Sequence, residues 1–80
     1  MKIPDVRVFI PADDLVGIPQ HPREPADHAR ARFIRAKLAE AGVPVRPTFG
    51  SDKVDVQCGH LLSKRDSKTG DLSFIWKPGS

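Results

Sequence analysis

The sequence predicts an α+β domain in which one helix packs on a small mixed sheet of three to four strands. Two observations carry this prediction. One segment, residues 25–41, has a helical repeat of apolar residues, and short runs rich in β-branched and aromatic residues lie on both sides of it. The expected order is strand, helix, strand, β-hairpin. A chain of 80 residues holds one hydrophobic core, so we expect a single domain over residues 1–80.

The first strand is expected at Val6–Ile10 (VRVFI), because its residues are β-branched or aromatic and Pro11 ends the run. Arg7 is its only polar residue, which predicts a strand buried on both faces. Residues 11–24 (PADDLVGIPQHPRE) are expected to form a long proline-rich loop. Loops of this length in compact domains are often functional.

The helix is expected from Pro25 to Ala41, with Pro25 at its first position and Gly42 as its terminator. Its apolar residues repeat at helical spacing and form one stripe, made of Ala31, Ile34, Leu38 and Ala41. Basic residues flank this stripe, with His28, Arg32 and Arg35 on one side and Arg30 and Lys37 on the other.

A short strand is expected after the helix at Val43–Arg46, at the edge of the sheet because Pro44 has no N–H to donate. If it pairs with Val6–Ile10, a right-handed crossover through the helix makes the two strands parallel. Alternation over Lys53–Leu61 (KVDVQCGHL) predicts a further strand, in which Gly59 is expected to add a bulge.

The hairpin is completed by a polar connection, residues 63–71, and a last strand, Leu72–Lys77. Leu72, Phe74 and Trp76 share one face of this strand. We therefore interpret Trp76 as core packing opposite the helix, and the alternative is a contact residue that stacks on a base or anchors an interface. Residues 78–80 are expected to fray.

The net charge of +3 permits nucleic-acid binding without requiring it. Cys58 is the only cysteine, so no disulfide forms within the chain, and a cytoplasmic location is expected. The N-terminal run breaks at Pro11 and turns acidic, which predicts neither a signal peptide nor a membrane span. Burial alone stabilises so short a chain only marginally, which leaves a homodimer or another partner open.

Cys58 and His60 are a weak candidate pair for a metal, since residues two apart in a strand point to the same side. His21 and His28 could in principle complete the ligand set. The usual paired spacing of zinc ligands is missing, so we expect no metal. The carboxylates Asp13, Asp14, Glu24 and Asp27 are assigned to turn formation and to the start of the helix. The glycines are scattered, and we expect no cofactor and no enzymatic activity.

The remaining signal is positive charge on the helix and on the hairpin. We expect a non-catalytic protein-binding module, an adaptor or inhibitor that docks on a larger assembly. The alternative is a nucleic-acid-binding module that contacts phosphates through the same basic residues. In size and element order the chain is similar to small accessory proteins of phages and mobile elements, although no motif supports this. The candidate contact residues are Arg30, Arg32, Arg35, Lys37, Lys64, Arg65, Lys68 and Trp76.

Overall fold

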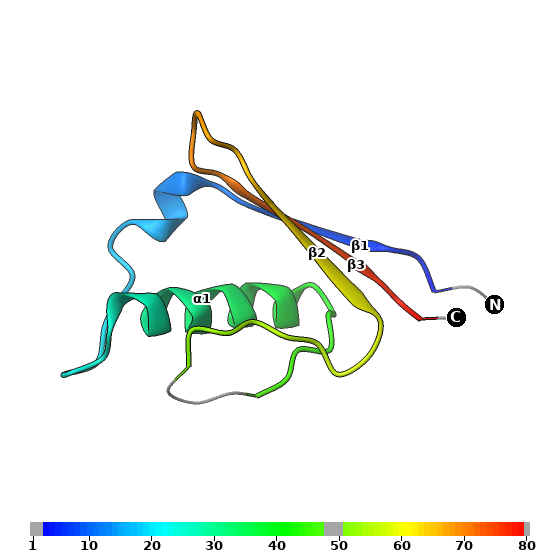
Figure 1. Ribbon diagram of the computed structural model, residues 1–80, viewed down its shortest axis with the longest axis horizontal. Helices are drawn as coiled ribbons and strands as arrows, with labels where there is room; N and C mark the ends of the chain where they lie inside the picture. The colour runs from blue at the N-terminus through cyan, green and yellow to red at the C-terminus, as the bar shows by residue number, and fades with distance from the viewer. Residues whose placement is uncertain (1–2, 48–50, 80) are drawn as a thin grey trace.

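The computed structural model describes residues 3–47 and 51–79 and forms two layers, a sheet and a helix (Figure 1). This confirms the α+β class. Pro78 and Gly79 follow the last strand, while Ser80, part of the tail expected to fray, lies outside the described residues. The elements are β1 (Val6–Ile10), the 3₁₀ turn η1 (Ala12–Leu15), α1 (Ala26–Glu40), β2 (His60–Arg65) and β3 (Leu72–Lys77).

The sheet has three strands in the order β1-β3-β2, and both pairings are antiparallel. β3 therefore lies at the centre, between the first strand and its own hairpin partner. Its side chains alternate as predicted, because Leu72, Phe74 and Trp76 are buried and Ser73 and Lys77 are exposed. The expectation of a mixed sheet is wrong, since no described strand pair is parallel.

The segment after the helix does not join this sheet. Val45 forms a single isolated bridge with Val56, and β1 pairs with β3 instead of with residues 43–46. Two features of the segment explain this. Pro44 cannot donate to a ladder, and the neighbouring Val43 turns into the hydrophobic core, where it is 4% exposed.

The prediction of a strand over Lys53–Leu61 is also wrong, because β2 begins only at His60. Gly59 has a φ of 74°, which interrupts the extended backbone before the strand instead of adding a bulge within it. Val56 is buried and Val54 is half-buried, so the alternation in this segment reports contact with the core. Cys58, the next residue in the alternation, is exposed.

The hairpin turn is shorter than predicted, because β2 continues to Arg65. The N–H of Asp66 donates to the carbonyl of Asp71 at 2.9 Å, and that of Gly70 donates to the carbonyl of Asp66 at 2.8 Å. The Asp71 carboxylate accepts the N–H of Ala12 at 2.7 Å. This last bond ties the start of η1 to the hairpin and fixes the chain where it leaves β1.

The helix matches its predicted bounds closely, with Pro25 at the N-cap instead of the first helical position. Gly42 has a φ of 97°, as its role of terminator requires. Ala41 is exposed, although the predicted stripe included it. The buried face of α1 consists of Ala29, Ala31, Ile34 and Leu38.

The helix covers one face of the sheet only (Figure 1). The prediction that β1 is buried on both faces is therefore wrong, because Phe9 on its other side is 62% exposed. The radius of gyration is 13.1 Å, larger than the about 12 Å expected of a compact chain of this length. The core cluster consists of Ile10, Ile34, Leu38, Val43, Val56, Leu72, Phe74 and Trp76.

Leu38 is 0% exposed, so Leu38→Ala should lower the free energy of unfolding by about 2–5 kcal/mol. Leu62 on the uncovered face is 51% exposed and provides a control of the same chemistry. Leu62→Ala should cost less than about 1 kcal/mol. Urea unfolding followed by Trp76 fluorescence measures both, and equal costs would contradict the assignment of faces.

Gly59 should tolerate a side chain poorly. A Cβ there would lie 2.8 Å from the indole nitrogen of Trp76, whose N–H donates to the carbonyl of Cys58 at 2.9 Å, and would also collide with the backbone of Lys77. Gly17 has a similar φ but open space around it. Gly59→Ala should therefore destabilise the protein by at least about 1 kcal/mol more than Gly17→Ala in the same unfolding measurement. Equal costs would show that both the indole and the Lys77 backbone move aside freely.

Candidate partner-binding surface

Arg32, a predicted contact residue, is engaged within the chain. Its guanidinium donates to the carbonyl of Pro19 at 2.7 Å and to the two carboxylate oxygens of Glu24 at 3.1 and 3.4 Å. The backbone N–H of His21 donates to the same carboxylate at 3.1 Å. Arg32 therefore clamps the long loop against α1, which is a structural role that helical periodicity alone does not reveal.

Two further basic residues of α1 are also engaged. Arg35 donates to the backbone carbonyl of Lys53 at 2.6 Å and so holds the segment that follows the helix. The ammonium group of Lys37 lies 5.5 Å from the centroid of the Phe33 ring, within cation–π distance. Arg32 and Arg35 thus bind other parts of this chain, while Lys37 contacts a ring of its own helix.

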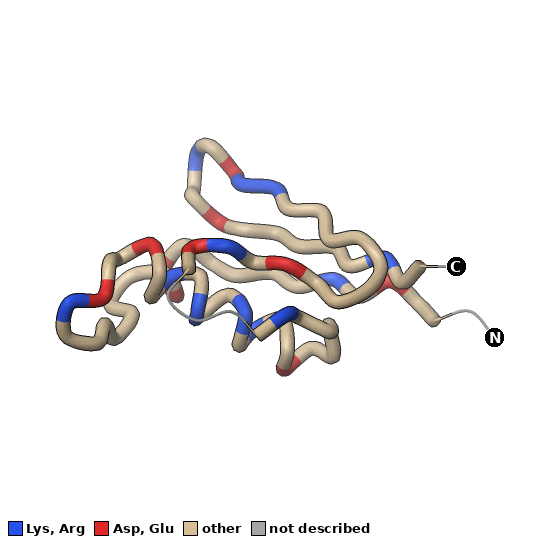
Figure 2. The backbone as a smooth tube through the Cα atoms, turned by 60° about the horizontal axis from the view of Figure 1, so that its bottom comes forward, with Lys and Arg blue, Asp and Glu red and all other residues tan. Residues whose placement is uncertain are grey.

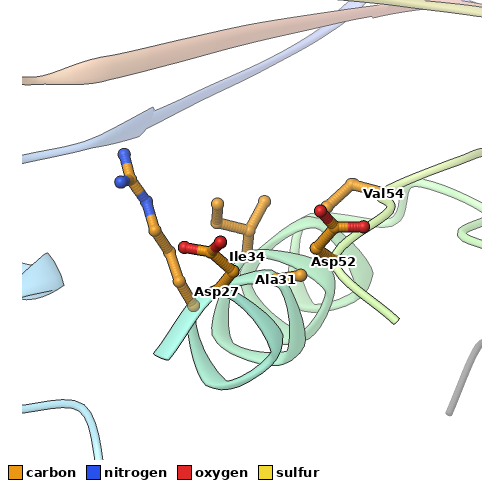
Figure 3. Close-up of a pocket in the computed structure, with 6 residues that line it drawn as sticks. Asp27, Ala31, Ile34, Asp52 and Val54 are labelled. Atoms are coloured by element: carbon orange, nitrogen blue, oxygen red, sulfur yellow. The ribbon is translucent and has the colours of Figure 1, made fainter. Parts of the chain in front are cut away.

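Arg30 lines a small cavity of about 190 Å³ beside α1, together with Asp27, Ala31, Ile34, Asp52 and Val54. Figure 3 shows the carboxylates of Asp27 and Asp52 on either side of the Ile34 side chain. The floor of the cavity is apolar and both carboxylates are exposed. Its net charge is negative, which makes it a poor site for phosphate or an acidic partner.

The hairpin cations do not join those of the helix into one surface, and Figure 2 shows them well apart. Lys64 lies opposite Ser73 in the β2–β3 register and shares with it the sheet face turned away from α1. Arg65 lies opposite the buried Leu72, on the helix side. Lys68 is exposed in the turn. Trp76, the remaining candidate, is 6% exposed and belongs to the core.

The sheet face away from α1, called the open face below, combines the predicted contact residue Lys64 with residues that the sequence did not single out as contacts. It is defined by the two registers and the alternation of each strand. Phe9 and Leu62 are 62% and 51% exposed, and Ile75 lies opposite Leu62 and diagonally from Phe9. The open face consists of Arg7, Phe9, His60, Leu62, Lys64, Ser73, Ile75 and Lys77.

The charge on the open face has one sign. Arg7, Lys64 and Lys77 are permanent cations, and no carboxylate occupies the outward positions of the three strands. Asp5 precedes β1, and the carboxylates at the hairpin end accept hydrogen bonds within the turn, Asp66 from Lys68 and Thr69 and Asp71 from Thr69. An apolar diagonal bordered by cations is therefore the most distinctive surface of the described chain.

A groove of about 430 Å³ lies along β2 on the face of the sheet that is turned toward α1. Leu61 and Ser63 of β2 line it, and Leu72 and Phe74 of β3 form its floor. Its far wall is the segment 52–56, in which Val54 and Val56 are apolar and Asp52 and Asp55 are acidic. The groove is thus apolar at its base and acidic on its far wall.

The weak metal pair is not completed in the structure. Cys58 and His60 are both exposed, and the positive φ of Gly59 between them breaks the alternation that would align their side chains. Within residues 3–47 and 51–79, no three His, Cys, Asp or Glu side chains are grouped so that they could hold a metal ion.

Comparison with known protein families, characterised proteins and solved structures gives no significant match. In the part of the chain that the structure describes, no helix has the length and apolarity needed to span a membrane.

The Arg32 clamp should be visible in the titration of Glu24. The hydrogen bond from Arg32, and then that from the His21 N–H, lower the pKa of this carboxyl below its ordinary value. Because the folded pKa is depressed, the clamp contributes stability above the unfolded pKa and loses it as the pH falls through the folded pKa. NMR titration should give a Glu24 midpoint below the ordinary value of a glutamate side chain, and Arg32→Gln should raise it. An unchanged midpoint in the variant would show that the clamp does not form in solution.

Proposed function

We propose that this chain is a small non-catalytic protein-binding module, an adaptor or inhibitor, which docks on an acidic surface of a larger partner. The open face is its contact surface. The observation that carries the proposal is the apolar diagonal of the exposed Phe9 and Leu62 and the half-buried Ile75, with cations on its borders and no carboxylate at the outward strand positions. Apolar centres with polar rims are typical of protein interfaces.

Charge selects the kind of partner. Arg7, Lys64 and Lys77 favour carboxylates, and they steer a partner with a negative surface toward the face before contact. Two copies of this chain could not dock through the same face without placing these cations against each other. The proposal therefore commits to a different protein and not to face-to-face self-association.

The hairpin keeps part of the role expected from the sequence. Lys64 belongs to the open face, and Lys68 lies in the adjoining turn, where it is exposed. The helix contributes indirectly, because Arg32 and Arg35 hold the loop and the segment 52–56 in place. The contact surface proposed here is thus the sheet with its hairpin, supported from behind by α1.

Nucleic acid is the second candidate, and the same observation favours it. A face without carboxylates can contact phosphates through its cations, while an exposed aromatic such as Phe9 can stack on a base. Anisotropy titration with mixed-sequence DNA and RNA at about 50 and about 200 mM salt tests this. Binding that falls by orders of magnitude at the higher salt would favour the nucleic-acid module over the protein-binding one.

Charge reversal on the open face should weaken partner binding. Arg7→Glu should reduce the affinity about tenfold or more, because it places like charges against an acidic partner. Lys53→Glu makes the same change in net charge at an exposed position outside the open face, and should have little effect. Both variants should unfold at nearly the same temperature as the parent protein.

The partner for this measurement can be captured with a photoreactive side chain at Phe9, and the same group at the exposed Ala36 of α1 is the control. Cross-linking from position 9, abolished by Arg7→Glu and mapped to an acidic segment of the captured protein, would support the proposal. Equal capture from position 36, or capture that Arg7→Glu leaves unchanged, would contradict it.

A further inference from the structure

The outer edge of β2 is free to accept another strand. β2 pairs with β3 on one side, and no described segment pairs with it on the other. Its side chains are exposed except for the half-buried Leu61. By contrast, the edge strand β1 is enclosed by two prolines, Pro4 before it and Pro11 after it, which lack the N–H that a new ladder would use.

The hydrogen-bond pattern of the hairpin shows which backbone groups of β2 point toward this edge. The N–H of Asp66 donates to the carbonyl of Asp71, so this facing pair is of the hydrogen-bonded kind. Hydrogen-bonded and non-hydrogen-bonded pairs alternate along an antiparallel ladder. In the β2–β3 register, the N–H and C=O groups of Leu61, Ser63 and Arg65 therefore point away from β3, toward the free edge.

The groove beneath β2 matches one face of an added strand. Leu61 and Ser63 point toward it, and its floor includes Phe74. Alternate side chains of an added strand would extend over this groove, where apolar groups fit. Asp52 and Asp55 on the far wall disfavour carboxylates at these inward positions.

The other face of an added strand would extend the open face beyond His60, Leu62 and Lys64. On this face β2 carries the cation Lys64 and no carboxylate, which favours acidic residues at the outward positions of the added strand. A second copy of β2 is disfavoured, because it would add its own cations to this edge.

We propose that the partner's docking element is an extended segment with alternating apolar and acidic residues, which adds to the free edge of β2 as a fourth strand. Its apolar residues lie over the groove and its acidic residues lie beside Lys64 on the open face. The inference rests on the proposed docking to an acidic protein, and it names the secondary structure of the docking element. Strand addition of this kind combines main-chain hydrogen bonds with side-chain specificity.

The test uses a synthetic ten-residue peptide of alternating valine and glutamate, with valine–lysine alternation as its control. On binding, the amide hydrogens of Leu61, Ser63 and Arg65 should exchange about tenfold or more slowly, since they gain acceptors. Ser63→Pro removes one outward N–H without touching the β2–β3 ladder and should weaken binding about tenfold or more. Ser63→Ala keeps the N–H and should bind as the parent protein does.

The outcomes separate this inference from the proposed function. Slower exchange at the edge residues, for the acidic peptide alone, supports strand addition even if Ser63→Pro does not fold. Binding that shifts the NMR resonances of Phe9 and Ile75, without slowing hydrogen exchange at the edge amides, overturns strand addition and leaves the open face as the docking surface. Equal binding of the acidic and lysine peptides overturns the charge selection on which both proposals depend. An acidic peptide that does not bind, while Arg7→Glu still abolishes cross-linking to the captured partner, overturns strand addition alone.

Discussion

The pairing of the first strand with the last is the constraint on which the rest of this structure depends. β1 and β3 are far apart in sequence, and their antiparallel register places β3 at the centre of the sheet. Closing so long a loop costs conformational entropy, which the burial of Leu72, Phe74 and Trp76 against α1 helps to offset. Because β3 has a neighbour on each side, β2 and β1 both become edges. The helix α1 covers one face of this sheet, and the opposite face stays open.

The sequence predicts well what neighbouring residues decide. The helix has a proline at its start and Gly42 after its end, and Leu72–Lys77 alternates between core and solvent as its pattern indicates. The segment before β2 has the alternation of a strand without being one, because Val54 and Val56 turn toward the core without belonging to a ladder. Strand pairing depends on contacts between distant residues. Local alternation reports which side of a segment is buried and leaves its partner undetermined.

The candidate site shows the same limit. A helical projection places Arg32 on a basic flank, but it contains no information about Glu24, which approaches from the loop and neutralises it. Arg35 likewise finds a backbone carbonyl in a later segment. The alternation of Arg7 and Phe9 in β1 is a signal for the open face, but the apolar composition of the strand favours burial on both sides and hides it. Which residues it gathers from β2 and β3 follows only from the register.

The open face and the free edge of β2 are two parts of one surface, because Leu62 and Lys64 belong to both. A partner segment that pairs with the edge would set its outward side chains beside the cations of the face, so the two contacts reinforce each other. Backbone pairing alone has little sequence preference, and a cationic face alone accepts many acidic molecules. Under the proposed strand addition, their combination would restrict the partner to an extended, alternating and acidic segment. The proposed binding surface would gain its specificity from these two contacts together.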